Sequence, residues 1–136
     1  MGKNSRNRKV DAAIHNFNAL VKAGGPRQFF KKVAAKKNKE AKVEYLSNEL
    51  RYYKKKGCRD ILIEFQLASD CLALDQRIRR VLEGVGVTVA GSIDRQYQQI
   101  EDELIKKVAE PSLTGGQLDR ILFQNYGDIM VRLLCP

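Results

Sequence analysis

This chain of 136 residues has little of the chemistry that most enzymes and metal proteins use, because it has one histidine, three cysteines and no tryptophan. No two cysteines have Cys-x-x-Cys spacing, so a zinc site would need His15, Cys58, Cys71 and Cys135 together at irregular spacings. Ser-His-Asp or Cys-His catalysis would also depend on His15, which is far in sequence from every cysteine. The sequence therefore predicts no metal ligand and no catalytic residue of these kinds.

Long hydrophobic runs are also missing. No stretch reaches the roughly 18 apolar residues of a membrane-spanning helix, and no apolar segment follows the basic N-terminus as it would in a secretory signal. An odd number of cysteines without such a signal is typical of reduced thiols, so we expect a cytoplasmic or nuclear protein without membrane contact. Cys71 and Cys135 are expected to be buried as small apolar side chains. A hydrophobic content of 43% excludes a disordered chain and, at this length, favours one domain.

Acidic residues are scarce in the first part of the chain. Residues 1–57 hold 16 Lys and Arg against 4 Asp and Glu, whereas residues 58–136 hold 9 against 12. The two parts thus carry net charges of +12 and −3 within a total of +9. This asymmetry is typical of a segment that binds a polyanion and is joined to a neutral or acidic body.

The basic part has the periodicity of helices. Residues 1–9 are polar and predict a flexible basic tail, and from Val10 the apolar residues recur at steps of three and four. Gly24-Gly25 predicts the end of this first helix, and Pro26 fits the first turn of the next one.

Residues 27–56 predict two further helical pieces. The second piece is expected to end at Gly57, with Lys54, Lys55 and Lys56 in its last turn. Three cations at that position would complement the negative end of the helix dipole.

The remaining part, 58–136, has the pattern of a βαβ-containing body. Three short apolar runs predict strands: 60–65, 87–90 and 129–134. A helix between the first two would make their pairing parallel, with a right-handed crossover. We expect Ile63, Leu74, Ile78, Leu82 and Val87 to form the core between these strands and that helix. The predicted fold class is α/β: a basic helical segment, 10–57, packed on a small three-stranded, mostly parallel sheet with helices, in one domain, 10–136.

Neither a cofactor nor a metal centre is predicted in this body. Gly84-Val85-Gly86 follows a helix, whereas a phosphate-binding glycine turn follows a strand and opens a helix, so these glycines predict a helix end. Asp70 and Asp94 could begin a two-carboxylate magnesium site, but each also fits the first turn of a helix, the former behind a Ser69 cap. We therefore expect no cofactor and no cleavage of RNA by this chain.

The candidate binding residues are lysines in three clusters with a tyrosine among them. Each phosphate that a lysine neutralises releases counterions, so several such contacts give affinity without base recognition. Aromatic rings nearby, on Phe30, Tyr45 and Tyr52, could stack on unpaired bases. The predicted nucleic-acid-binding residues are Lys31, Lys32, Lys36, Lys37, Lys39, Tyr52, Lys54, Lys55 and Lys56.

These features favour a non-enzymatic nucleic-acid-binding module. RNA is preferred over DNA because no helix-turn-helix, zinc-finger or basic-zipper pattern is present. Three alternatives stay open: a localisation or ribonucleoprotein-anchoring patch, a protein-interaction or scaffold module with acidic partners, and a small metal-dependent nuclease.

The order of features between Phe29 and Ile93 resembles that of a known family. An aromatic and lysine-rich segment comes first, followed by an expected helix, an expected strand that ends in Phe, another helix and a glycine-flanked segment: Phe29–Lys37, Glu44–Lys56, Ile61–Phe65 and Gly84–Gly91. Over about half of the chain, this order resembles the region just upstream of the PIN-like domain in an uncharacterised eukaryotic protein family. The resemblance implies an RNA-related setting and no nuclease residues, because PIN-like domains open with a strand that ends in Asp and the nearest candidate here, Cys71–Gln76, has helical spacing.

Overall fold

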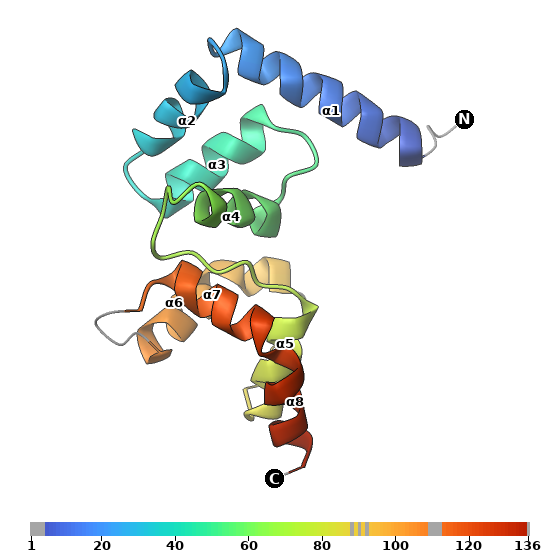
Figure 1. Cartoon of the computed structure of the whole chain (residues 1–136), viewed down its shortest axis with the longest axis vertical. Helices are drawn as coiled ribbons and strands as arrows, with labels where there is room; N and C mark the ends of the chain where they lie inside the picture. Colours follow the sequence, from blue (N-terminus) through green and yellow to red (C-terminus); the bar gives the residue numbers. More distant parts are fainter. Residues whose placement is uncertain (1–4, 88, 90, 92, 109–112, 136) are drawn as a thin grey trace. The chain divides into compact units, whose positions relative to one another are not determined.

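The computed structural model describes residues 5–87, 89, 91, 93–108 and 113–135, and these residues form eight helices and no β-strand (Figure 1). The predicted α/β class, with its three-stranded and mostly parallel sheet, is therefore wrong, and the described fold is all-helical. The chain divides after Leu67 into two compact units, which we call unit 1 (residues 1–67) and unit 2 (residues 68–136). None of the described helices is both long and apolar enough to cross a membrane.

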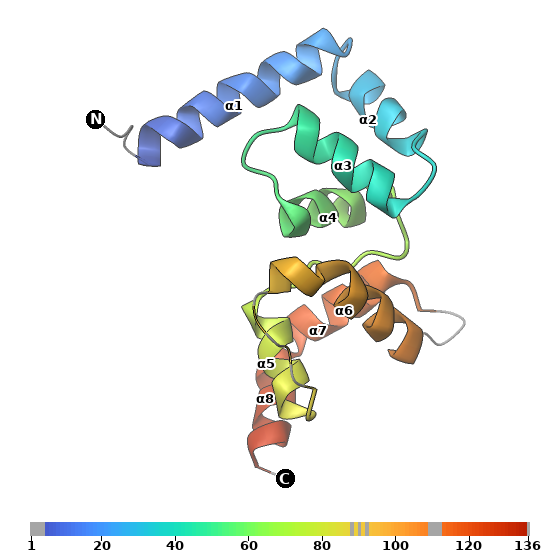
Figure 2. The ribbon, with the colours of Figure 1, turned by 180° about the vertical axis from the view of Figure 1, so that it is seen from behind.

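The described part of unit 1 consists of four helices: α1 (Ser5–Lys22), α2 (Pro26–Ala34), α3 (Lys39–Glu49) and α4 (Lys55–Glu64). Helix α3 packs against both α2 and α4, and α2 also contacts α1 (Figures 1 and 2). The core includes three pairs of buried side chains, and a spacing of four residues puts each pair on one face of its segment: Phe29 and Val33, Leu46 and Leu50, Cys58 and Leu62.

The first helix ends where the sequence predicts. Gly24 has a left-handed φ of 93°, and the Gly25 N–H donates to the Leu20 carbonyl at 2.9 Å, which closes the helix with a Schellman motif. Pro26 then occupies the first turn of α2, as expected. At its other end α1 begins at Ser5, so residues 5–9 of the expected tail are helical.

The segment predicted as the first strand, 60–65, is helical instead. Its apolar residues continue a helical pattern that starts at Cys58, since Cys58, Ile61, Leu62 and Phe65 follow one another at steps of three, one and three. Helix α4 ends without a glycine, because Gln66 adopts the left-handed conformation (φ 53°) and the Leu67 N–H donates to the Leu62 carbonyl at 2.8 Å. Gly57, expected to end a helix, lies in the first turn of α4.

The described part of unit 2 also consists of four helices: α5 (Gln76–Gly84), α6 (Ile93–Val108), α7 (Gly115–Gln124) and α8 (Tyr126–Leu134). Helix α8 packs against α5 and contacts α7. The third predicted strand, 129–134, lies within α8. In the second predicted strand, 87–90, Val87 and Val89 are not in a strand, and residues 88 and 90 lie outside the described residues. The prediction that Gly84–Gly86 ends a helix is confirmed, since the Val87 N–H donates to the Leu82 carbonyl at 2.9 Å.

The core of unit 2 contains three of the five side chains that the sequence predicts to pack together, namely Leu74, Ile78 and Leu82. Val87 is exposed and Ile63 belongs to α4 in unit 1, because neither lies in the expected strand. The cap of α5 is Asp75 rather than Ser69, and the Asp75 carboxylate accepts from the N–H groups of Arg77 and Ile78.

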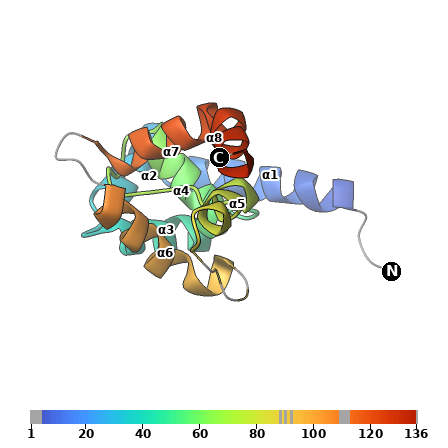
Figure 3. The same cartoon turned by 90° about the horizontal axis from the view of Figure 1, so that it is seen from below.

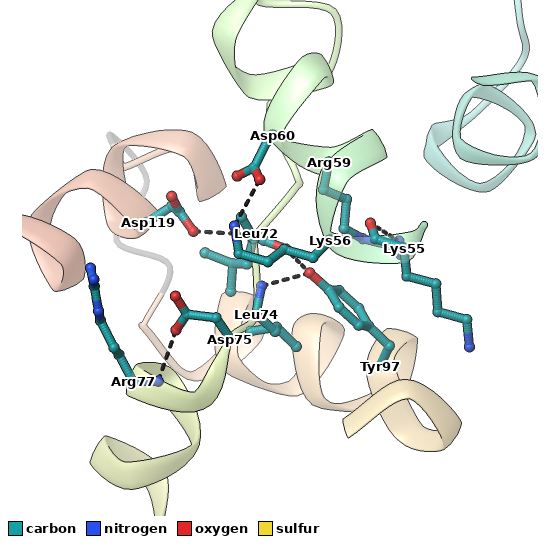
Figure 4. A network of polar contacts seen from close by, with 11 residues as sticks. Lys55, Lys56, Arg59, Asp60, Leu72, Leu74, Asp75, Arg77, Tyr97 and Asp119 are labelled. Atoms are coloured by element: carbon teal, nitrogen blue, oxygen red, sulfur yellow. Dashed lines mark hydrogen bonds and ion pairs between the residues drawn. The ribbon is translucent and has the colours of Figure 1, made fainter. Parts of the chain in front are cut away.

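A non-helical segment, Cys71–Leu74, is buried in unit 2, and we call it the buried segment. It has no neighbouring strand, so side chains from α6 and α7 satisfy its backbone. The Leu72 N–H donates to the Glu101 carboxylate at 2.8 Å and the Ala73 N–H to the Asp119 carboxylate at 2.8 Å. The Tyr97 hydroxyl accepts from the Leu74 N–H at 2.6 Å and donates to the Leu72 carbonyl at 2.9 Å (Figure 4). Such partners are required because a buried backbone group without a hydrogen bond costs free energy.

Candidate nucleic-acid interface

The positive charge of the chain belongs to unit 1. Unit 1 holds 17 Lys and Arg against 6 Asp and Glu, whereas unit 2 holds 8 against 10. The net charges are thus +11 and −2. All nine predicted binding residues lie in unit 1, where the structure divides them into two groups and removes one of them from the surface.

The first group, which we call the α2 lysine group, consists of Lys31 and Lys32 in the last turn of α2 and Lys36 and Lys37 just after it. Lys31, Lys32 and Lys37 are exposed, because the buried face of α2 carries Phe29 and Val33 instead. Lys36 is half-buried, and its Nζ atom lies 4.6 Å from the centre of the Tyr45 ring. Three of the four side chains are therefore placed to contact a large anion without disturbing the core.

Two of the three aromatic rings considered for base stacking contact other rings within unit 1. The Phe30 ring stacks on Phe65 with centroids 4.4 Å apart, and the Phe29 and Tyr45 ring centroids lie 5.7 Å apart. Burial, with a smaller effect of the Glu49 carboxylate, raises the pKa of Tyr45, so its phenol stays neutral beneath Lys36. Phe30 and Tyr45 are thus engaged in packing.

Lys39 differs from the other predicted lysines, because it is only 4% exposed. It lies at the start of α3, directly after Asn38, whose side chain caps the helix by accepting from the Ala41 N–H. Its ammonium group lies 3.9 Å from the Glu40 carboxylate. Periodicity could not identify it as buried, since Lys is rarely found inside a protein unless it is paired.

The second group, which we call the α4 lysine group, consists of Lys54, Lys55 and Lys56, all exposed. The sequence predicts these lysines in the last turn of a helix, but the structure puts them at the beginning of α4, with Lys54 as its N-cap. The first turn contains no acidic residue, and the Lys54 side chain makes no capping hydrogen bond. Lys56 reaches Asp60 one turn on, at 2.7 Å (Figure 4). Cations here add to the positive end of the helix dipole and oppose helix formation.

Tyr52 stands beside the α4 lysine group, in the loop between α3 and α4. Its side chain is 60% exposed, and its φ of 75° is in the left-handed region, which is unfavourable for a residue with a Cβ atom. The loop is held from α1, where the Asn16 amide donates to the Arg51 carbonyl at 3.0 Å and its side-chain oxygen accepts from the Arg51 N–H at 2.7 Å. The His15 Nε2 atom lies 3.1 Å from the Glu49 carbonyl oxygen. Contacts between residues this far apart in sequence leave no local pattern, so the sequence could not predict this clamp.

The two lysine groups lie at opposite ends of α3, one before its first residue and one after its last (Figures 1 and 2). A helix of 11 residues is about 16 Å long. A ligand that contacts both groups must therefore span roughly this length.

No cluster of three or more His, Cys, Asp or Glu side chains able to hold a metal ion occurs among the residues that the structure describes. Asp70 lies in the non-helical segment before α5, and the Asp94 side chain is outside the described part. Cys71 is buried as predicted, but the prediction for Cys135 is wrong, because this residue is exposed after the end of α8. Cys58 is also buried, and burial raises its pKa to about 11 although the nearby Arg59 lowers it.

Comparisons with protein-family models, curated proteins and solved structures found no match to this chain. The charge, exposure and conformation of the residues in unit 1 are therefore the features that bear on function.

Proposed function

We propose that this chain is a non-enzymatic nucleic-acid-binding module of the cytoplasm or nucleus that binds single-stranded RNA through unit 1. The observation that carries the proposal is a net charge of +11 on unit 1, with six of the nine predicted residues being exposed lysines. Each phosphate contact releases counterions, so several lysines together give affinity that does not depend on the base sequence.

Two local features support a ligand at the start of α4, because both of them oppose folding. A lysine at a helix N-terminus is unfavourable by about 0.3–1 kcal/mol, which the Asp60 carboxylate offsets for Lys56, and a bound phosphate would turn the remaining repulsion into attraction. The left-handed conformation of Tyr52 costs about 1–3 kcal/mol and keeps an aromatic ring in solvent. A base stacked on this ring would recover part of that cost, since stacking contributes about 1–3 kcal/mol per base.

Charge reversal at two lysines tests the α2 lysine group. Lys31→Glu with Lys32→Glu should reduce the affinity for single-stranded RNA and lower the slope of log affinity against log salt by about 1.4, the value for two lost phosphate contacts. Lys106→Glu with Lys107→Glu is the matched control, because these exposed lysines occupy the last turn of α6 in unit 2 and the change in net charge is the same. Equal losses in both variants would show that binding follows net charge alone and would contradict the assignment of the surface.

Substitutions at Tyr52 separate binding from folding. Tyr52→Gly removes the ring and suits the left-handed φ, so it should raise or preserve the stability of unit 1 while reducing RNA affinity by about 5- to 150-fold. Tyr52→Phe keeps the stacking surface and should bind RNA with nearly unchanged affinity. If Tyr52→Gly binds RNA as tightly as the unaltered protein, the ring has no part in the site.

The same titrations decide between the proposed function and its alternatives. Duplex RNA and duplex DNA, run beside the single strand, should bind more weakly because unpaired bases alone offer faces for Tyr52. Absence of binding to all three nucleic acids at low salt would overturn the proposal in favour of an acidic protein partner. Incubation with labelled RNA in Mg²⁺ and in Mn²⁺ should leave the RNA intact, and cleavage would favour the nuclease alternative.

A further inference from the structure

Helix α1 exposes its apolar face and turns a polar face toward its own unit. Val10, Ile14, Phe17 and Val21, which we call the α1 stripe, are between 53% and 65% exposed. The opposite side contains Ala12, which is buried, and the two side chains that bind the α3–α4 loop. Surface helices normally have the reverse orientation, with the apolar stripe toward the core. The helix also extends past α2, α3 and α4 toward its N-terminal end (Figures 1 and 3).

We propose that the α1 stripe is the seam of a parallel two-stranded coiled coil formed by two copies of this chain. The stripe residues follow one another at steps of four, three and four, the spacing of the a and d positions of a heptad. Ile14 and Val21 then occupy a positions, and Val10 and Phe17 occupy d positions. Asn7 occupies the a position one heptad earlier, and a single Asn at such a position selects register and a two-stranded state.

The charges beside the seam match a second copy in the parallel orientation. In this register Arg6 is a g residue and Asp11 is the e residue five positions later, so each would face the other across the dimer. Both side chains also interact within their own chain, so the pair would set orientation more than affinity. The remaining cations of α1, Arg8, Lys9 and Lys22, occupy b and c positions away from the seam. A groove on an acidic protein would match the residues beside the seam less well, because these residues carry both positive and negative charge.

The size of the stripe predicts a dimer that dissociates readily. Four half-exposed side chains form an apolar patch of a few hundred Å² at most. Two such patches bury well below the roughly 1,600 Å² of a standard stable interface, so the dimer should form at micromolar to submillimolar concentration. This inference does not depend on RNA binding, because the seam and the lysine groups share no residue.

Sedimentation analysis without RNA, between about 1 µM and 1 mM, tests the dimer. The unaltered protein should show a monomer–dimer equilibrium that Phe17→Glu abolishes. The matched control is Val131→Glu on α8, because Val131 is 63% exposed and Phe17 is 65% exposed. Asn7→Val should tighten the dimer, since a polar a residue lowers its stability. A protein that stays monomeric throughout, or a dimer that survives Phe17→Glu, would overturn the proposal and leave the stripe to another partner.

Disulfide trapping tests the parallel register. With Cys135→Ser in place to remove the exposed thiol, Val10→Cys should form a disulfide-linked dimer under mild oxidation, because a parallel seam brings each d residue against its own copy. An antiparallel seam would separate the two introduced thiols, so a dimer that resists this trapping would contradict the parallel arrangement. Asp11→Arg should weaken the dimer, and adding Arg6→Asp should restore it if the two residues face each other.

Discussion

Removing a single hydroxyl group should destabilise unit 2, because that hydroxyl serves two backbone groups of the buried segment. The Tyr97 side chain is 1% exposed, and its oxygen binds both the Leu74 N–H and the Leu72 carbonyl. Tyr97→Phe keeps the ring and its packing, so no large cavity forms. It leaves a buried N–H without this partner, at about 1–3 kcal/mol, and it removes a second hydrogen bond of about 0.5–1.5 kcal/mol. We expect a loss of about 2–3 kcal/mol in the free energy of unfolding.

Urea denaturation followed by far-ultraviolet circular dichroism measures this loss, and Tyr53→Phe provides the control because Tyr53 is 40% exposed whereas Tyr97 is buried. For a unit of this size, each kcal/mol lowers the thermal midpoint by about 4–8 °C. Because two units can unfold separately, hydrogen exchange at the amides of Leu72 and Leu74 should accompany the melts and locate the change. The exchange of both amides should accelerate in Tyr97→Phe and stay unchanged in the control.

Two outcomes would refute the argument. A change below about 0.5 kcal/mol, the range of ordinary surface substitutions, would mean that the hydroxyl does not sustain the buried segment. A large loss without faster exchange at Leu72 and Leu74 would mean that Tyr97 stabilises the unit by some route other than these two hydrogen bonds.

Particular contacts lead to four further predictions. Gly115→Ala should cost about 1–3 kcal/mol in the same urea experiment, because its Cβ would lie 2.7 Å from the Cys71 carbonyl oxygen, a backbone atom that cannot move freely. Lys54→Ser should stabilise α4 by about 1 kcal/mol through a new N-cap while weakening RNA binding, so melts and titrations should change in opposite senses. Iodoacetamide at mild pH should modify Cys135 before Cys58, as peptide mapping would show. The raised pKa of Cys58, about 11 against an ordinary 9.0, stabilises the fold fully below pH 9.0, and this contribution should be lost between pH 9.0 and about 11 because the unfolded chain ionises first.

The helix ends that contain glycine could be predicted from the sequence, and the end of α4 could not. Gly24 and Gly86 adopt positive φ where the chain leaves α1 and α5, which is the geometry that glycine signals. Gln66 adopts the same left-handed conformation at the end of α4, where its side chain makes that conformation strained. No sequence rule predicts a glutamine at such a position. Without a recognised end after Phe65, the run 60–65 resembles a buried strand more than the last turns of a helix.

A short apolar run fits a buried strand as well as part of a buried helix. The wrong strand predictions at 60–65 and 129–134 share one cause. The pattern of α4 becomes helical only when Cys58 is counted as apolar, and that of α8 only when Tyr126 is joined to Ile129, Met130 and Leu133. In each case the residues that complete the helical period precede the run that predicts a strand. A half-buried strand alternates between apolar and polar residues, and neither run does so over its full length.

The candidate interface was predictable in composition but not in arrangement. The exposure of Lys31, Lys32 and Lys37 follows from the apolar spacing of α2, so it could be inferred from the sequence. The burial of Lys39 depends on how other segments pack around the start of α3. Lys54–Lys56 would stabilise a helix that ends at Gly57, but they oppose α4, which begins at Lys55. Neither is a local property of the sequence.

The two units use polar side chains in opposite ways, which explains why the proposed functions fall on unit 1. In unit 2, Glu101, Tyr97 and Asp119 turn inward and satisfy the backbone of the buried segment, so their polarity contributes to stability. In unit 1, an uncapped cationic helix start, the left-handed Tyr52 and an exposed apolar stripe each cost stability to the isolated chain. Natural proteins retain such costs mainly at functional sites. A ligand that binds only the folded state stabilises that state. Each of these costs would therefore be offset by one partner: an anion at the lysines, a base on Tyr52 and a second copy on the α1 stripe.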